Sequence, residues 1–600
     1  ILSIAWIYRN SLIIVITPLL LLPLVGKSEV ASCAFSLCIM AVYWTTEACP
    51  LAVTSLLPII LFPMLGIISA DNISMMYTRQ INFLFVGGLI MAVAIQEWNL
   101  HRRIALKVLM LIGSRPCWIL LGLMVVTAML SMWISNTATT AMMVPIASAV
   151  YDQMSDLKQA EKSTSDEEAS LKVNINPVKD DRDRNSGEAL PSNRTNEGKR
   201  IGYNQINETN SPHGVTVNVT NIPSTVRTLN DDKRKKSGDK NLRKAMLLCI
   251  AYSANIGGFA TLIGTPANLL LPGALISVFG EGAAEQVDFV SWMGFSLPIS
   301  VTCLFFTWIW LQFRFIGIRI KKQLWQKGDK QKDNRVKAYI FNSYRQLGPI
   351  SFGEMAVFAH FVILAILWLT RDPKFISGWK DLFPQGRPSL IKDSTSAMLI
   401  CFSLFVFPSK NPFRKSEDPS ELPVASPALL GWKTLEKNFA WDVFFLLGAG
   451  FALARACEDS GLSDSVGDAI SGLGDISPAG FALIISIILS LLTEFTSNVS
   501  TASIFLPILC RLASHSGIHP LYIAIPATIS CSFAFSLPVA TPPNAIAFSY
   551  GGLKVKDLIS TGLVLNFICV LILNGFLNTT GVAIFNLNDV SSLSNLTNQL

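Results

Sequence analysis

Two similar polar phrases occur far apart in this apolar chain: SNTATTAMMVPI at residues 135–146 and SNVSTASIFLPI at residues 497–508. Each copy places hydroxyl and carboxamide side chains directly after a hydrophobic run, where polar groups without partners are costly. Paired polar breaks in the two halves of one apolar chain are typical of a binding site that is built by an internal repeat.

The composition indicates an all-α polytopic membrane protein. Of the 600 residues 51% are hydrophobic and 15% are charged, and the mean hydropathy is +0.45. Apolar runs recur along the chain, and a helix needs about 20 residues to cross a bilayer, so we expect about 11 transmembrane helices. Several runs are interrupted by Gly, Pro, Ser and Asn, which predicts half-helices or re-entrant hairpins among them.

The repeat has a constant register. The second phrase lies 362 residues after the first, and the same shift aligns residues 83–100 with residues 445–462. A third pair, IGTPANLL at 263–270 and VATPPNAI at 539–546, aligns with an offset of 276. The two offsets differ by 86, close to the length of the polar segment 152–243. The sequence therefore predicts an internal duplication with an insertion in the first copy. A duplication can also have a structural role alone, without forming a binding site.

Segment 152–243 is rich in Lys, Asp, Asn, Ser and Glu, a composition that predicts a disordered loop. Its basic excess places it in the cytoplasm, and such loops explain the net charge of +7 without nucleic acid. Counting membrane crossings from there puts the C-terminal tail outside. The sequons at Asn578 and Asn595 are then expected glycosylation sites.

Four polar or proline breaks carry the candidate chemistry. Hydroxyl and amide groups after each hydrophobic run can donate hydrogen bonds to an anion. Pro266 and Pro542 cannot continue a helical hydrogen-bond ladder, so the carbonyls around Gly264 and Ala540 become free to coordinate a small hard cation. The plainer alternatives are Ser and Thr side chains bonded within their own helix, and a simple proline kink.

These motifs, with WNLHRRIAL at 98–106 and SFAFSLPVATPPNAIAFSYG at 532–551, resemble the divalent anion–sodium symporter family, solute carrier family 13. The resemblance covers nearly the whole chain apart from 152–243. It implies inverted repeats, two re-entrant hairpins, a scaffold domain that forms a homodimer, and a transport domain that moves as an elevator. The implied segments are scaffold helices (1–80), first-repeat transport elements (81–151), the cytoplasmic loop (152–243), further first-repeat transport elements (244–290), second-repeat scaffold (291–438), second-repeat transport elements (439–556) and the last helix with its external tail (557–600).

The resemblance also implies the site residues. One sodium ion would be held by Ser131, Ser135, Asn136 and Gly264, and a second by Thr493, Thr496, Asn498 and Ala540. The substrate would meet Ser135, Asn136, Thr137, Thr265, Ser497, Asn498, Val499 and Thr541. Val499 departs from the SNT found in both halves of some bacterial members, so the second motif lacks one hydroxyl.

The implied function is sodium-coupled import of di- or tricarboxylates, such as succinate and citrate, across the plasma membrane. Sulfate-transporting relatives tend to read SNP and ANPPN in the second half, whereas this chain reads SNV and ATPPN. A sodium–sulfate symporter, a sodium-independent carboxylate exchanger and an anion channel remain as alternatives. An enzyme is not expected, since no GxSxG, HExxH or paired intramembrane aspartates occur.

Three charged residues outside the motifs carry their own expectations. Glu494 lies beside the second phrase, where it would tune cation binding, pair with a cation or form a structural bond. Arg102 and Arg103 are expected to snorkel to a membrane interface.

Overall fold

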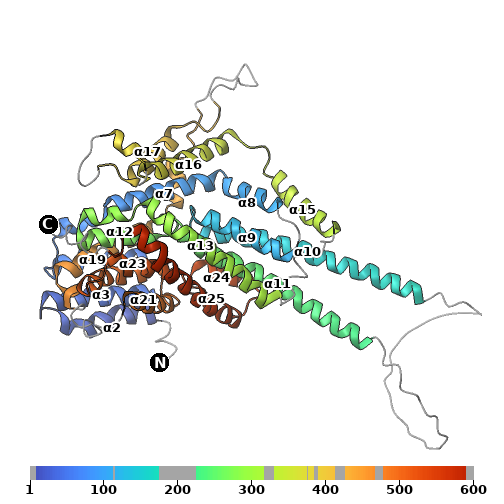
Figure 1. The fold of residues 1–600 in the computed structure, drawn as a ribbon, viewed down its shortest axis with the longest axis horizontal. Helices are drawn as coiled ribbons and strands as arrows, with labels where there is room; N and C mark the ends of the chain where they lie inside the picture. Colours follow the sequence, from blue (N-terminus) through green and yellow to red (C-terminus); the bar gives the residue numbers. More distant parts are fainter. Residues whose placement is uncertain are drawn as a thin grey trace, which may run out of the picture. The chain divides into compact units, whose positions relative to one another are not determined.

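The computed structural model describes residues 8–111, 115–173, 225–316, 330–373, 376–383, 390–411, 426–465 and 477–588. These residues are largely helical and contain no β-strand, only one isolated bridge between Pro408 and Ala428. The predicted all-α class is confirmed for this part of the chain. Figure 1 shows the helices, coloured from blue at the N-terminus to red at the C-terminus.

The helices before the polar insertion are short in several places, because turns and prolines divide the apolar runs. Ser28 and Ser69 cap two of them by accepting a backbone N–H with their hydroxyls. The elements are α2 Arg9–Leu21, η1 Leu22–Leu24, α3 Glu29–Thr46, α4 Leu51–Thr54, α5 Leu57–Met64, α6 Ala70–Tyr77, α7 Gln80–Glu97, α8 Leu100–Met110, α9 Pro116–Ser131 and α10 Asn136–Val173.

The helices after the insertion follow the same pattern. Capping boxes begin two long apolar helices, one at Asp288 and one at Ser351, where the side chain of Glu354 returns to the Ser351 N–H. The elements are α11 Thr225–Gly258, α12 Pro266–Phe279, η2 Glu281–Gln286, α13 Phe289–Leu311, η3 Gln312–Ile316, α15 Lys330–Arg345, α16 Phe352–Arg371, η4 Trp379–Leu382, α17 Asp393–Val406, α18 Trp432–Asn438, α19 Trp441–Asp459, α21 Pro478–Leu492, α22 Asn498–His515, α23 Pro520–Ser530, α24 Pro542–Ser549, α25 Val555–Phe576, η6 Leu577–Gly581 and α26 Val582–Phe585.

Fewer continuous spans are present than the hydropathy predicts. Within the described ranges, five helices are long and apolar enough to cross a membrane, or six if the bent pair α18 and α19 is one span. Seven further apolar helices have only 10–17 residues, below the length of about 20 that a crossing needs. The chain is a multi-pass membrane protein, whereas the number of 11 spans stays a prediction, because short helices must combine to reach it.

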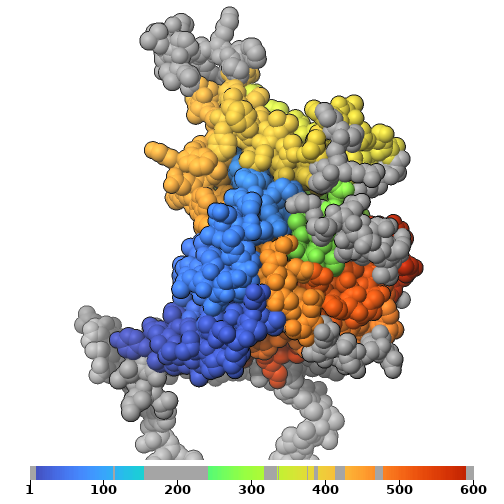
Figure 2. Space-filling model, turned by 90° about the vertical axis from the view of Figure 1, so that its left-hand side faces the viewer, coloured from blue at the N-terminus to red at the C-terminus, as the bar shows by residue number. Residues whose placement is uncertain are grey.

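The duplicated elements pack on one another within the larger unit. Helix α12 of the first copy contacts α19, α22 and α23 of the second copy. Helix α19 also contacts α3, α4, α5 and α6, and Figure 2 shows the orange second-half residues lying against the blue N-terminal residues. The motif-bearing helices of both halves therefore share one buried core.

The polar insertion forms a separate unit. The chain divides into Ile1–Met154 with Gly238–Leu600 as one unit and Ser155–Ser237 as the other. Residues 152–173 and 225–243 of the predicted disordered loop are helical, as continuations of α10 and α11. Adding residues to an existing helix costs far less than starting one, so a polar composition does not stop these helices. Residues 174–224 lie outside the described part, so the prediction of disorder is untested there.

Arg103 does not snorkel to an interface as predicted. Its side chain is 6% exposed and lies 3.0 Å from the Glu354 carboxylate, and it also donates to the carbonyls of Leu347 and Gly348. A buried guanidinium needs such partners, because leaving it unpaired is costly. The stretch WNLHRRIAL therefore contributes a structural ion pair between α8 and α16.

Candidate functional site

Both SN phrases lie at a helix break that is held by a hydroxyl and an asparagine. Helix α9 ends at Ser131, and Ser131 Oγ lies 2.6 Å from Oδ1 of Asn136 at the start of α10. In the second copy, Thr493 Oγ1 lies 2.9 Å from Asn498 Oδ1. Both pairs differ by 362 residues, so the predicted register is confirmed at the level of single atoms.

The same hydroxyls also reach the neighbouring segment of their own half. Ser131 Oγ lies 2.7 Å from the carbonyl of Ala254, and Thr493 Oγ1 lies 2.9 Å from that of Cys531. The second carbonyl is one residue further along than the offset of 276 predicts. In each half, a hydroxyl at the helix break therefore bonds to the end of the helix that precedes the proline segment.

The two proline segments unwind in the same way. Asn268 Nδ2 donates to the carbonyls of Gly258 and Thr261 at 3.3 and 2.7 Å. The equivalent Asn544 Nδ2 donates to the carbonyls of Ala534 and Leu537 at 2.9 and 3.0 Å. All three members of each set are related by the offset of 276. The asparagine of each TP(A/P)N phrase thus holds open the irregular segment before it.

Gly264 and Ala540 occupy equivalent places in these segments. The N–H of each donates at 3.3 Å to an equivalent carbonyl, that of Thr261 or that of Leu537. A side chain at Gly264 would come within 3.0 Å of the Met132 carbonyl and of Thr261 Oγ1. Only glycine fits this close approach, which lines the break with backbone oxygens of the kind that hard cations bind.

Four helices begin at the motif residues. Ser135, Thr265, Ser497 and Thr541 directly precede α10, α12, α22 and α24. The side chains of Thr265, Ser497 and Thr541 do not cap these helices, while Ser135 Oγ accepts from Ala138 N at 3.3 Å. Helix N-termini carry partial positive charge and unsatisfied N–H groups, so the four starts favour an anion.

The third residue of each phrase, Thr137 or Val499, is at least partly accessible. Thr137 is exposed and makes no hydrogen bond with any described residue, whereas Val499 is half-buried and has no hydroxyl to offer. Thr496 donates to the carbonyl of Leu492 and lies 2.5 Å from Thr501 Oγ1, so its hydroxyl is already engaged.

A cavity of about 230 Å³ adjoins the first phrase. It is lined on one side by the WNLHRR stretch, including Asn99, whose backbone is left-handed with φ 51°. The full lining is Gln96, Asn99, His101, Ile134, Ala138, Thr139 and Met142. The hydroxyl of Thr139 is buried without a hydrogen-bond partner among the described residues. The motif residues therefore border a space with unused polar groups.

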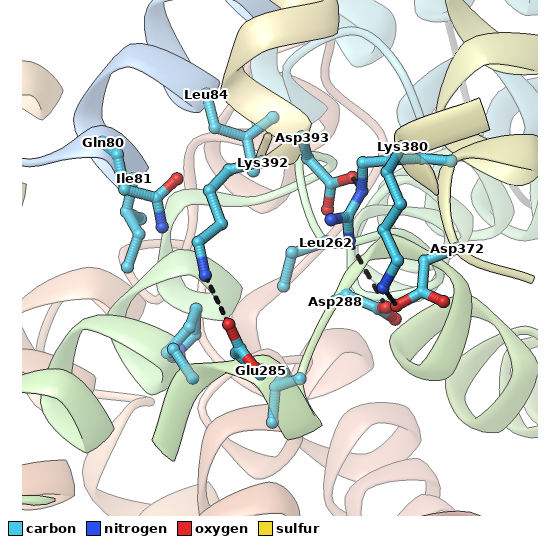
Figure 3. Close-up of a pocket in the computed structure, with 14 residues that line it drawn as sticks. Gln80, Ile81, Leu84, Leu262, Glu285, Asp288, Asp372, Lys380, Lys392 and Asp393 are labelled. Carbon is cyan, nitrogen blue, oxygen red and sulfur yellow. Dashed lines mark hydrogen bonds and ion pairs between the residues drawn. The ribbon is translucent and has the colours of Figure 1, made fainter. Parts of the chain in front are cut away.

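A second cavity, of about 190 Å³, is lined by Gln80, Leu262, Pro272 and several charged residues. Figure 3 shows Lys392 directed at Glu285, 2.9 Å away, and Lys380 beside Asp372, 2.7 Å away. Arg371 lies 3.4 Å from Asp288. Because its basic groups are already paired, this cavity is a weaker candidate for an anion than the motif residues.

Glu494 has a structural bond instead of a cationic partner among the described residues. Its carboxylate accepts backbone N–H groups from Phe535, Ser536 and Leu537 at 2.8–3.0 Å. Asn566 Nδ2 of α25 adds a bond of 2.7 Å. The carboxylate therefore satisfies the N–H groups that the proline break exposes, which only the folded arrangement reveals.

The sequence interpretation missed Asn255, a buried residue of α11. Its amide accepts from Asn136 Nδ2 at 3.4 Å and donates to Thr541 Oγ1 at 3.2 Å, so it joins the two halves. The available signal was an asparagine within the apolar run 245–260, where an amide needs a partner.

The glycosylation predictions remain open. Asn578 is exposed in η6, where its Nδ2 donates to the Asn574 carbonyl at 2.8 Å and its Oδ1 accepts from the Tyr522 hydroxyl. A glycan on Nδ2 would have to displace the first of these bonds. Asn595 lies outside the described residues.

The sequence was compared with protein-family models and with known proteins. Residues 3–587 match the family model described as the sodium:sulfate symporter transmembrane region. The chain belongs to this family, the divalent anion–sodium symporters. The human Na(+)/dicarboxylate cotransporter 3 is 42% identical over 589 residues, which are 97% of this chain and 93% of that protein. Human solute carrier family 13 member 2 is 42% identical over 98% of this chain and 95% of its own length. The mouse Na(+)/citrate cotransporter is 40% identical over 98% of both chains.

Proposed function

We propose that this divalent anion–sodium symporter imports di- or tricarboxylates, such as succinate or citrate, together with sodium ions. One observation carries the proposal: the hydroxyl–asparagine pair at the helix break recurs 362 residues later, each beside an unwound segment of its own half. Two of the relatives named above are a Na(+)/dicarboxylate and a Na(+)/citrate cotransporter, which supports the same substrate class.

The sodium ions would bind at the oxygen-rich breaks. In the first half the ligands would be Ser131, Ser135, Asn136 and Gly264, and in the second half Thr493, Thr496, Asn498 and Ala540. Amide, hydroxyl and carbonyl oxygens suit a small hard cation. The amide oxygens of Asn268 and Asn544 support a polar occupant nearby, because both are buried without a hydrogen-bond donor among the described residues.

The carboxylate substrate would lie between the four helix starts. Ser135, Asn136, Thr137 and Thr265 would contact it from the first half, and Ser497, Asn498, Val499 and Thr541 from the second. Sodium bound at each break would offset the negative charge of the substrate, so the anion would bind well only after the cations. Each sodium entering down a potential of 100 mV contributes about 2.3 kcal/mol, which can concentrate an anion inside the cell.

The movement would be that of an elevator in the plasma membrane. Helices α9 and α21, with 16 and 15 residues, are too short to cross alone and are followed by a break, which supports two re-entrant hairpins in an inverted repeat. The scaffold helices would form the homodimer, segment 152–243 would face the cytoplasm, and the tail after residue 557 would end outside.

The test is uptake by cells that express the full chain. Labelled succinate and citrate should enter saturably in sodium medium and at least tenfold more slowly when choline replaces sodium. Equal uptake in choline would contradict the coupling and favour an exchanger. The family description mentions sulfate, so unlabelled citrate, succinate and sulfate are compared as competitors. Inhibition by sulfate alone would show a sodium–sulfate symporter.

A further inference from the structure

Asn255 forms hydrogen bonds to motif residues of both halves of the candidate site. It lies in the last turn of α11, is 1% exposed, and belongs to none of the repeated phrases. On one side its Oδ1 accepts from Asn136 Nδ2 at 3.4 Å, and on the other its Nδ2 donates to Thr541 Oγ1 at 3.2 Å. One carboxamide therefore spans from the first SN phrase to the second TPPN phrase.

The bonds along this path all run in one direction. Asn136 Nδ2 donates to Asn255 Oδ1, and Asn255 Nδ2 donates to Thr541 Oγ1. The row begins at Asn136 Oδ1, which faces Ser131 Oγ at 2.6 Å; that hydroxyl has one hydrogen and also faces the Ala254 carbonyl at 2.7 Å. Hydrogen bonds in such a row polarise one another in a low-dielectric interior. A cation near Asn136 Oδ1 would draw electron density toward that oxygen and strengthen each N–H donor further along the row.

The far end of the row is a substrate donor. Thr541 Oγ1 accepts from Asn255, which directs its own hydrogen elsewhere, and no described residue accepts that hydrogen. A hydroxyl whose lone pair is already used is well placed to donate to a carboxylate. Fixing Asn255 therefore fixes the direction in which Thr541 presents its hydrogen.

The second half has no matching bridge among the described residues. The offset of 276 relates Asn255 to Cys531, whose side chain is fully buried, and Thr541 to Thr265. No hydrogen bond joins Cys531 to Thr265 within the described part of the chain. Among the described residues, the Asn255 bridge therefore has no counterpart related by the repeat, although the half-sites themselves are repeated.

We propose that Asn255 is a positioning residue that couples sodium binding at Asn136 to the orientation of the substrate donor Thr541. This inference rests on the proposed symport and deepens it. It predicts that sodium and carboxylate bind cooperatively through this amide and that removing the amide separates the two events without abolishing the fold.

The experiment measures labelled succinate uptake, and labelled citrate uptake in parallel, against sodium concentration for the full chain, normalised to surface expression. Asn255→Leu removes both bonds at similar volume. It should raise the half-saturating sodium concentration and the substrate KM about 3- to 10-fold, as expected for one or two hydrogen bonds. The Hill coefficient for sodium should fall, while the maximal rate at saturating sodium and substrate stays within about twofold. Asn255→Ser keeps a short donor and acceptor and should recover part of both shifts.

Asn574→Leu is the matched control, because Asn574 is also a buried asparagine, and among the described residues its side chain bonds Ser486 and its own helix instead of a motif residue. Equal shifts in Asn574→Leu and Asn255→Leu would overturn the inference, since the loss of any buried amide would then produce the same effect.

If Asn255→Leu does not reach the cell surface, the sodium dependence of Asn255→Ser tests the coupling instead. A wild-type sodium affinity and Hill coefficient in Asn255→Ser would overturn it. A wild-type protein without sodium dependence would overturn the proposed symport, and the coupling with it. A sodium-dependent wild type with unchanged Asn255 variants would overturn the coupling alone.

Discussion

Asn566 Nδ2 donates to Glu494 Oε1 at 2.7 Å and so links α25 to the carboxylate that holds the second proline break. Three consecutive backbone N–H groups share the same carboxylate. Position 132 of the first copy, equivalent to Glu494, is a methionine whose carbonyl accepts from Thr261 Oγ1 at 2.5 Å. The two breaks are thus stabilised by different chemistry although their geometry matches.

Glu494→Gln is expected to weaken this break. A neutral amide keeps one acceptor oxygen but loses the charge, and hydrogen bonds to charged groups contribute about 1.5–3 kcal/mol each. We expect a loss of about 2 kcal/mol or more in unfolding free energy and reduced uptake, measured by thermal unfolding of the purified protein and by succinate uptake. Glu47→Gln is the control, because Glu47 is exposed at the end of α3. A wild-type melting temperature for Glu494→Gln would contradict the structural role.

Asn136→Ala and Asn498→Ala are each expected to abolish sodium-dependent uptake without lowering surface expression. Each substitution removes the amide that faces its half-site hydroxyl at 2.6 or 2.9 Å. Uptake should fall at least tenfold, as measured with labelled succinate and surface biotinylation. Asn438→Ala, at an exposed position of α18, should transport normally. Normal uptake in either site variant would remove that half from the proposed site.

Gly258→Ala is expected to displace the first asparagine. A Cβ at this position would lie 2.5 Å from Asn136 Oδ1 and 2.8 Å from its Nδ2, closer than real contacts allow. We expect sodium affinity to fall at least tenfold, read from the sodium dependence of uptake. Gly294→Ala in α13 has nothing within 4 Å of the added carbon and should behave as wild type. An unchanged sodium affinity in Gly258→Ala would show that Asn136 can move without consequence.

Arg371→Ala is expected to destabilise the protein by about 3–5 kcal/mol, because it leaves Asp288 and Asp393 as buried charges without their guanidinium. The side chains of all three residues are 7–8% exposed. Lys392→Ala breaks the neighbouring pair with Glu285, whose side chain is 45% exposed, and should cost only about 0–1 kcal/mol. Thermal unfolding of both variants checks the difference, and equal melting temperatures would argue against a buried ion triad.

Val499→Thr is expected to restore the hydroxyl that the second phrase lacks. One additional hydrogen bond to a substrate carboxylate contributes about 0.5–1.5 kcal/mol, so the KM for succinate should fall about 2- to 10-fold. Val555→Thr, exposed at the start of α25, serves as the control. The hypothesis that position 499 contacts the substrate would fail if both variants kept the wild-type KM for succinate and for citrate.

Much of the repeat could be predicted from the sequence, because identical short phrases preserve their spacing. The hydrogen bond of Asn498 repeats that of Asn136 at an offset of 362, and the hydrogen bond of Asn544 repeats that of Asn268 at an offset of 276. The number of spans could not be predicted as well, since hydropathy does not show where an apolar run such as 519–540 unwinds after α23.

Hydrogen-bond and ion-pair partners that lie far apart in the sequence were harder to predict than the positions of the helix breaks. Nothing local in the sequence pairs Asn255 with Thr541, 286 residues away, or Arg103 with Glu354, 251 residues away. Glu494 was recognised as costly at membrane depth, but its backbone partners depend on a segment about 40 residues further along. Such contacts follow from tertiary packing, which periodicity and composition do not encode.

The joint between the duplicated helices differs in length between the two copies. In the second copy, α22 and α23 are joined by residues 516–519 alone. The offsets place the equivalent joint of the first copy at residues 154–243, next to the boundary of the separate unit Ser155–Ser237. The same helix pair thus closes with four residues or with a long insert, so length at this joint is independent of the geometry of the duplicated site. We therefore expect an epitope or a reporter domain introduced at this joint to leave the candidate site intact.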